Sequence, residues 1–177
     1  MHCLGWRVVD IPSMGSATYS DINLLAADTG AQIAIALSRP GTIIGFTEFI
    51  KAGGGNYTTT SNTLVAVDST LGLLTFACPA SGTVLLEANF TVEGSAVAAP
   101  QVGWLNNSGG AQVGEVRAIN YSTAVVLPNC TRIRITGLVP FQSYTLQLAW
   151  LVNAGTMTLT GGSSTANSIL LYAMTTP

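Results

Sequence analysis

Apolar and polar residues alternate along most of this chain with the period of a β-strand. The clearest segment is Thr83–Glu93, where an apolar side chain occupies every second position from Val84 to Val92 and mostly polar ones stand between. A period of two sends one set to a buried face and the other towards solvent. Because no segment holds a sustained helical period, the pattern predicts an all-β protein.

Short strands separated by turn residues are predicted along the rest of the chain. Arg39-Pro40-Gly41 and Pro79-Ala80-Ser81-Gly82 mark turns, and Gly53–Asn62 is predicted as one loop. Many short strands with regular turns are typical of an antiparallel β-sandwich or jelly roll. The other predicted strands are Gln32–Leu37, Thr42–Lys51, Thr63–Asp68, Leu73–Cys78, Gln101–Leu105, Val113–Ile119, Ser122–Leu127, Thr131–Thr136, Ser143–Asn153, Thr156–Thr160 and Ser168–Thr175.

Residues 1–25 differ from the remaining β-domain, residues 26–177. Pro12 and Gly15 interrupt any regular element, and apolar residues precede them. We predict an arm or first edge strand that docks on a neighbour through Leu4, Trp6 and Val8. The alternative is that Trp6 caps the core of its own domain.

Charged residues are scarce. They make up 8% of the chain, against about a quarter in ordinary domains, and Ile135–Pro177 contains none. In Ile169–Met174 both strand faces are apolar, and such a strand needs cover from outside its own sandwich. We therefore predict a subunit of an oligomer, in which sister copies cover Tyr144, Leu146, Trp150, Leu170, Tyr172 and Met174.

The composition excludes several kinds of partner. Net charge is −2 and the six basic residues are scattered, so no nucleic-acid surface is expected. No window approaches the roughly 18 consecutive apolar residues of a membrane span, and the first residues lack the apolar core of a signal peptide. Three cysteines without CxxC spacing predict neither a disulfide framework nor a zinc site. We expect Cys78 and Cys130 to be small buried hydrophobes.

Residues for catalysis are also lacking. The single histidine, His2, stands beside Cys3 in the predicted arm, and this pair cannot fill a four-coordinate metal site. Glu87 and Glu93 share a strand face but lie about 20 Å apart, too far for a glycosidase pair. We therefore expect no enzyme, no metal and no cofactor.

Two aromatic positions are candidates for ligand binding. Trp104, followed by Asn106 and Asn107, is predicted to offer a ring and amides to a sugar, such as a host-surface glycan. The alternative is a core Trp104 followed by an ordinary hairpin turn. Tyr57, beside a run of threonines, is a second candidate surface.

Two stretches carry a resemblance to a known group. The first is Tyr57–Asp68 followed by Leu74–Ala88, and the second is Ile135–Trp150 ending in Ala166–Met174. Both resemble small β-rich domains of minor tail and other virion proteins of tailed bacteriophages, particularly those of actinobacterial hosts. Related domains resemble the C1q/TNF-like jelly roll, which implies a homotrimer with its final strands near the threefold axis.

A corner motif supports an alternative fold. Gly137-Leu138-Val139-Pro140, with Tyr144 four residues later, resembles the fibronectin type III signature. That resemblance implies that the tyrosine hydroxyl bonds back to the backbone a few residues upstream. A fibronectin type III or immunoglobulin-like sandwich is therefore the alternative to the jelly roll.

The expected function is a non-enzymatic structural role. The resemblance implies a trimeric domain on the virion, as a minor tail or tail-tip protein or a capsid decoration protein, assembled in the host cytoplasm and docked on other virion proteins. One alternative is a soluble C1q-like or fibronectin-like binding module. Another is a glycan-binding or glycan-cleaving domain.

Overall fold

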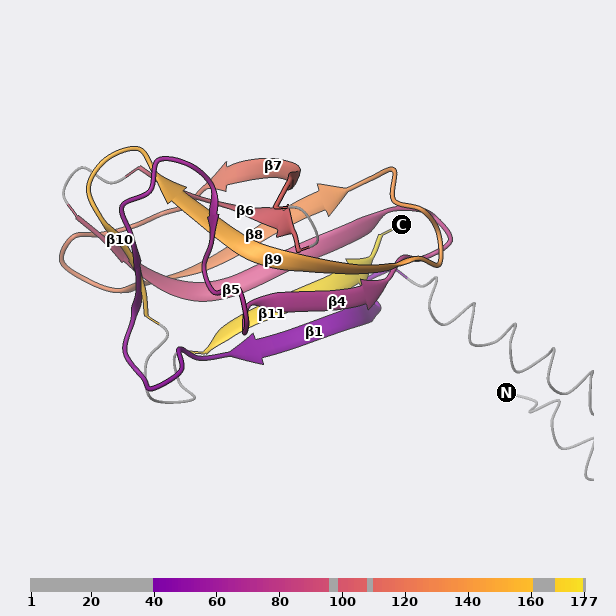
Figure 1. The fold of residues 1–177 in the computed structure, drawn as a ribbon, viewed down its shortest axis with the longest axis horizontal. Coiled ribbons are helices and arrows are strands. Elements are labelled where there is room, and N and C mark those ends of the chain that lie inside the picture. The colour runs from indigo at the N-terminus through magenta and orange to yellow at the C-terminus, as the bar shows by residue number, and fades with distance from the viewer. Residues whose placement is uncertain (1–39, 96–98, 108–109, 161–167, 177) are drawn as a thin grey trace, which may run out of the picture. The chain divides into compact units, whose positions relative to one another are not determined.

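Two antiparallel sheets form the described part of the computed structural model, which covers residues 40–95, 99–107, 110–160 and 168–176 (Figure 1). The chain divides into two units, Met1–Ser38 and Arg39–Pro177, and the described residues belong to the second. The predicted docking arm with Leu4, Trp6 and Val8, and the predicted strand Gln32–Leu37, lie outside the described residues. The described part holds no helix with the length and hydrophobicity of a membrane span.

Eight longer strands and three short ones build the sheets. The longer ones are β1 (Ile43–Phe49), β4 (Leu73–Ala77), β5 (Val84–Gly94), β6 (Pro100–Asn106), β7 (Gln112–Ala118), β8 (Leu127–Ile135), β9 (Ser143–Val152) and β11 (Ile169–Thr175). The short ones are β2 (Tyr57–Thr59), β3 (Val65–Ala66) and β10 (Met157–Leu159).

The strand order is that of a jelly roll. In the six-stranded sheet, β1 pairs β11, β11 pairs β5 and β5 pairs β8, while β10 and β2 continue from the far part of β5. In the five-stranded sheet, β4 and β3 pair β9, which pairs β6 and then β7. The predicted antiparallel jelly roll is therefore confirmed. The alternative is wrong, because the first described strand pairs the last described one, whereas the immunoglobulin-type order places the first strand with the second.

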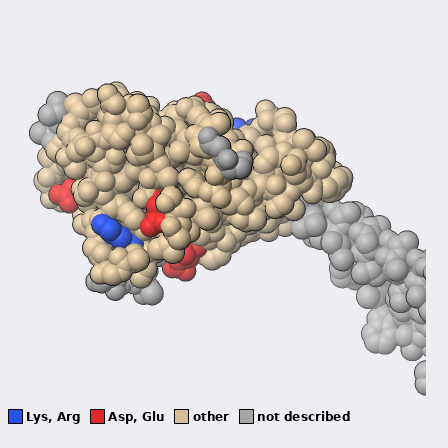
Figure 2. Space-filling model, viewed as in Figure 1, with Lys and Arg blue, Asp and Glu red and all other residues tan. Residues whose placement is uncertain are grey.

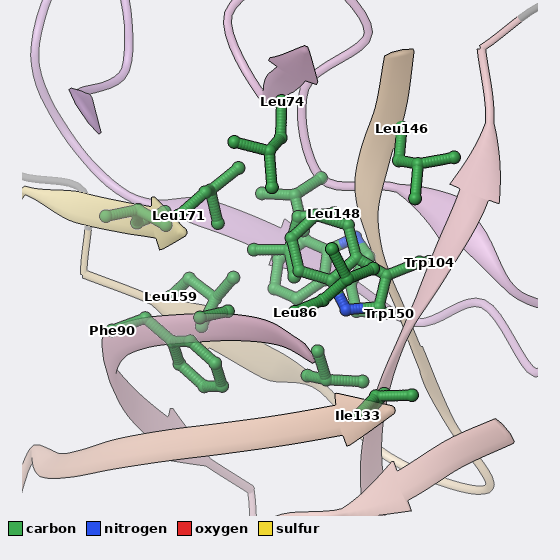
Figure 3. Packing of buried hydrophobic residues seen from close by; sticks show 14 of the residues in the cluster. Leu74, Leu86, Phe90, Trp104, Ile133, Leu146, Leu148, Trp150, Leu159 and Leu171 are labelled. Atoms are coloured by element: carbon green, nitrogen blue, oxygen red, sulfur yellow. The ribbon is translucent and has the colours of Figure 1, made fainter. Parts of the chain in front are cut away.

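The core lies between the inner faces of the two sheets. On β5 the predicted alternation is complete: every residue from Val84 to Gly94 switches between buried and half-buried. Leu86 from β5 and Ile133 from β8 face side chains of the opposite sheet, among them the fully buried Trp104 (Figure 3). Burial of such side chains contributes roughly 1.5–3 kcal/mol each, which makes this core the main source of stability.

Two local predictions were wrong. Ser122–Leu127 is a loop up to Val126, because the Ser122 hydroxyl accepts the backbone N–H groups of Ala124 and Val125 and closes a turn there. Tyr57–Thr59, predicted as part of a loop, is strand β2 and pairs β10. That pairing joins segments about a hundred residues apart, so no local pattern announces it.

The corner between β8 and β9 confirms the feature that the motif implied. The Tyr144 hydroxyl accepts the backbone N–H of Val139 at 2.9 Å. The Tyr144 ring also stacks on Phe76 of β4, with centroids 6.0 Å apart. A tyrosine corner therefore occurs here within a jelly roll, where it fixes the loop that crosses from one sheet to the other.

Candidate functional site: the outer face of the six-stranded sheet

The outer face of the six-stranded sheet presents side chains in rows that cross β1, β11, β5 and β8. The register of the three pairings defines each row. The rows are Ile43, Met174, Leu85 and Arg134; then Phe46, Tyr172, Glu87 and Arg132; then Glu48, Leu170, Asn89 and Cys130. The face is therefore mainly apolar along β1 and β11, apart from Glu48, and mainly polar along β5 and β8, apart from Leu85.

The apolar half forms a continuous surface, here called the apolar patch. Phe46 is 52% exposed and Ile43 is 54% exposed. The Phe46 and Tyr172 rings are tilted against each other with centroids 5.2 Å apart. The other members are half-buried. The patch consists of Ile43, Phe46, Leu85, Leu170, Tyr172 and Met174.

The polar half centres on the carboxylate of Glu87. Arg132 Nε donates to Glu87 Oε2 at 2.6 Å, and Asn89 Nδ2 donates to Glu87 Oε1 at 2.8 Å. Burial acts to raise the pKa of Glu87, but the hydrogen bond from Asn89 and the bond and charge of Arg132 outweigh it and hold the pKa below its usual value. Glu87 is thus an ionised structural carboxylate with both oxygens occupied.

A shallow groove of about 360 Å³ lies beside this network. It is lined by Asn89, Phe90, Thr91, Pro128, Asn129, Cys130, Ser168 and Leu170. Cys130 is exposed there, so its prediction as a buried hydrophobe was wrong, whereas Cys78 is buried as predicted. Among the described residues, no group of three or more His, Cys, Asp or Glu side chains is placed to hold a metal ion.

The predicted oligomer surface separates into two parts. Leu170, Tyr172 and Met174 lie on the outer face, in the apolar patch. Leu146 and Trp150 are 1% and 2% exposed and belong to the core of their own subunit, so placing them at an interface was wrong. The reason is that the six-stranded sheet covers their face of β9. Tyr144 is partly buried at the edge of the same core.

The predicted ligand surfaces are not assembled. Trp104 is fully buried and Tyr57 is 7% exposed, so neither ring is available to a sugar. The Tyr57 hydroxyl instead donates to Asp68 Oδ2 at 2.8 Å. Asn106 is the last residue of β6 and Asn107 lies in the turn that follows, where Asn107 Oδ1 accepts from the amide of Gln147. The alternative interpretation, a core tryptophan followed by a hairpin turn, is the one that holds.

Sequence reasoning missed several exposed large hydrophobic side chains, among them Phe46, Val139 and Phe141. The exposure of Phe46 could not be predicted, because apolar residues occur on both faces of Thr42–Lys51 and the period of two is ambiguous there. Val139 and Phe141, in the corner before β9, are 58% and 78% exposed. The only signal was that a three-residue apolar run, Leu138-Val139-Pro140, continues into Phe141 at a predicted turn.

Charge is sparse on the folded surface as in the sequence. Figure 2 shows one face, over which acidic and basic side chains occupy only small, separate areas. Besides the Arg132–Glu87 pair, the described residues include one other ion pair, Arg117 with Glu115, on the exposed strand β7. Exposed pairs of this kind contribute about 0–1 kcal/mol, so ionic contacts are a minor element of this surface.

Comparisons with known proteins locate similar folds. No family model and no curated protein matches the chain. Among solved structures, the chain is similar to a carbohydrate-binding module, CBM6cm-2, from Cellvibrio mixtus lichenase 5A (20% identity, 78% of this chain and 92% of that one, TM-score 0.40). It is also similar to the Eiger TNF of S. frugiperda (12% identity, 78% and 96%, TM-score 0.40).

A third similar structure is the tripod from the baseplate of bacteriophage Tuc2009. Its identity to this chain is 15%, with 69% of this chain and 63% of that one covered and a TM-score of 0.36. At such identities and scores, none of these similarities bears on function.

Proposed function

We propose that this chain is a non-enzymatic structural subunit that assembles as a homotrimer on the surface of a tailed-phage virion. Its role is that of a minor tail protein or a capsid decoration protein. The apolar patch is the interface between copies. The observation that carries the proposal is the patch itself, an aromatic and aliphatic area on the outer face of a sheet in a chain with very few charges.

The physical reason for assembly is the unfavourable hydration of the patch. Exposed apolar surface gains roughly 25 cal/mol for each Å² removed from water. Phe46 and Ile43 each keep more than half of their surface in contact with solvent in the single subunit. Clustered apolar residues rimmed by polar ones mark interaction sites. A polar border of Glu48, Glu87 and Arg132 fits the rim of such an interface.

The resemblance to phage virion domains supports the location, and the chain's own residues support the absence of catalysis. The only histidine is at position 2, and both oxygens of Glu87 are engaged by Asn89 and Arg132. A domain of this kind acts by binding and by stabilising an assembly.

Oligomeric state tests the proposal directly. Sedimentation velocity of the full chain should give the mass of three copies. Tyr172→Glu, in the patch, should shift the particle to one copy. Val125→Glu is the matched control, because Val125 is 56% exposed in the loop before β8, outside the patch, and should leave the trimer intact. A wild-type chain that stays monomeric at micromolar concentration would overturn the homotrimer.

Location requires a separate measurement. Immunogold electron microscopy of purified phage particles that encode the chain should place label on the tail or on the capsid. Washed particles without the chain would overturn the virion role while leaving the oligomer untouched.

A glycan-binding surface is the second candidate function. The observation that favours it is the pair of aromatic rings, Phe46 and Tyr172, beside the fixed hydrogen-bonding groups of Glu87 and Asn89. Apolar surface with a few fixed polar groups is typical of ligand sites. If a monomeric chain binds glycans on an array and Tyr172→Ala abolishes that binding, this function replaces the trimer.

A further inference from the structure

The corner between β8 and β9 projects an apolar tip, Val139-Pro140-Phe141, at one end of the sandwich. This is the end where β11 finishes and β5 begins (Figure 1). Phe141 is 78% exposed, the highest value among the exposed large hydrophobic residues of the described chain, and Val139 is 58% exposed. The tip stands on the tyrosine corner, so its position is fixed by the packing of Tyr144 on Phe76.

The backbone donors of the tip are all satisfied within the subunit. Leu138 N–H bonds to Gly82 C=O, and Phe141 N–H bonds to Cys78 C=O at 2.9 Å. Val139 N–H is taken by the Tyr144 hydroxyl, and Pro140 has no N–H. An unpaired N–H buried away from water is costly. Because the N–H groups of this tip are paired, it can enter an apolar environment without burying an unpaired backbone donor.

Phe141 also stores backbone strain. Its φ is +64°, and it is the only non-glycine residue of the described chain with a positive φ. The left-handed conformation is energetically costly for a non-glycine residue, because its Cβ lies too close to the following carbonyl oxygen. A residue this exposed recovers little of that cost by burial in its own subunit. Strain held at a rigid, exposed aromatic points to a contact made outside the subunit.

A second copy of the chain offers a matching surface. The apolar patch presents the exposed Phe46 ring beside the half-buried Tyr172 ring, without a charged side chain among its members. The tip carries no cation that would attract anionic lipid headgroups, since Ile135–Pro177 has no Lys or Arg. Aromatic anchors packed in apolar surroundings dominate many protein interfaces. The absence of cations from the tip therefore favours contact with an apolar protein surface such as the apolar patch over contact with a membrane.

We propose that the tip of one subunit packs with Phe141 on the Phe46–Tyr172 region of the next subunit. This inference rests on the proposed homo-oligomer. The tip lies at an end of the sandwich and the patch on a sheet face, so the contact joins two different surfaces of identical chains. Such a heterologous contact repeats by rotation and closes into a ring when the rotation allows it. A cyclic trimer needs this kind of contact.

The test is a charge exchange read out by sedimentation equilibrium of the full chain. Phe141→Lys and Phe46→Glu should each weaken assembly by about thirtyfold in dissociation constant, the effect of losing one interface anchor. The double variant should recover part of the loss, because the two new charges are then neighbours across the interface. Val125→Lys is the control and should assemble as the wild type does. Phe141→Asn, which tolerates the left-handed conformation, checks that the loss comes from the side chain.

The outcomes separate this contact from the trimer itself. If Phe46→Glu dissociates the oligomer while Phe141→Lys and Phe141→Asn assemble normally, the tip contact is overturned and the oligomer stands. If the wild type is monomeric, the proposed function fails first. A photo-reactive benzoyl-phenylalanine in place of Phe141 should cross-link to peptides that contain Phe46 or Tyr172 of another copy. Cross-links elsewhere contradict the contact.

Discussion

Two tyrosine hydroxyls fix loops of this sandwich, one as an acceptor and one as a donor. The Tyr144 hydroxyl accepts the Val139 N–H, and the spacing of the corner motif predicted this bond. The Tyr57 hydroxyl donates to Asp68, and nothing in the sequence predicted that bond, because it joins strand β2 to the segment after β3. Local motifs fix a residue's partner only when the partner lies within the same turn.

Removal of the Tyr144 hydroxyl should weaken the corner without disturbing the core. Tyr144→Phe keeps the ring on Phe76 but leaves the Val139 N–H without its acceptor. We expect a loss of about 1 kcal/mol in the free energy of unfolding, the usual contribution of one such bond. Urea denaturation measures it. A loss above about 3 kcal/mol would contradict the account, since it would require damage to the core as well.

Asp68 should make stability depend on pH at the acid end. Burial acts to raise its pKa, but the N–H groups of Leu71 and Thr70 and the Tyr57 hydroxyl outweigh it, and the folded pKa lies below the unfolded value. A lowered folded pKa adds stability above the unfolded value of about 3.9 and loses it as pH falls through the folded pKa. Asp68→Asn should therefore be destabilised by about 1–2 kcal/mol near pH 7 and match the wild type near pH 2. Thermal unfolding across that range measures the difference, and a gap that persists near pH 2 counts against a charge effect.

For the individual strands, the alternation of apolar and polar residues identified the long strands. It did not show what covers each face of a strand. On β9 the lack of charge suggested cover by sister subunits. Instead, the outer face of β9 carries neutral polar side chains that form hydrogen bonds. The Thr145 and Thr75 hydroxyls bond to each other at 2.9 Å, and the Gln147 amide donates to Asn107. Hydroxyls and amides hydrogen-bond to each other and to water without charge. The outer face remains mainly apolar on β1 and β11, together with Leu85 of β5. Sequence could not separate β9 from β11, because both of these strands lack charge.

Gly45 sets the closest approach between β1 and β4, which belong to different sheets. A Cβ at this position would lie 2.7 Å from the Thr75 carbonyl oxygen and 2.9 Å from Phe76 Cβ. Gly45→Ala should therefore cost about 1–3 kcal/mol, as overpacking does. Gly103→Ala on β6 is the matched control, because its nearest neighbours lie 3.3 Å away or more. Chemical denaturation of both variants tests the comparison, and equal losses contradict it.

For the whole molecule, sequence predicted the fold class and an exposed apolar surface on the last strand. The jelly-roll order could be anticipated because alternating strands with regular turns limit the chain to a few two-sheet topologies. The members of the patch could not, because they come from three strands brought together by pairings between distant segments. Phe46 and Tyr172, which touch across the patch, are far apart in the sequence.

An assembly held by this patch should respond weakly to salt. Its members are uncharged, and screening acts only on ionic contacts. Between about 0.1 and 1 M NaCl, the dissociation constant of the oligomer should change by less than about threefold. Sulfate should tighten it, since sulfate strengthens apolar burial. Loss of assembly in NaCl would show that ion pairs such as those available to Arg134 hold the copies together.

The first and last described strands begin and end side by side. Gly41 N–H bonds to Thr175 C=O, and Thr175 N–H returns to Thr42 C=O, each at 2.9 Å. The start of β1 and the end of β11 are therefore held next to each other by these two hydrogen bonds. A short linker between these two ends permits circular permutation, with new termini cut at an exposed turn such as 123–126. Because these two ends lie side by side, the sandwich can also be inserted into a surface loop of another protein without distorting either fold.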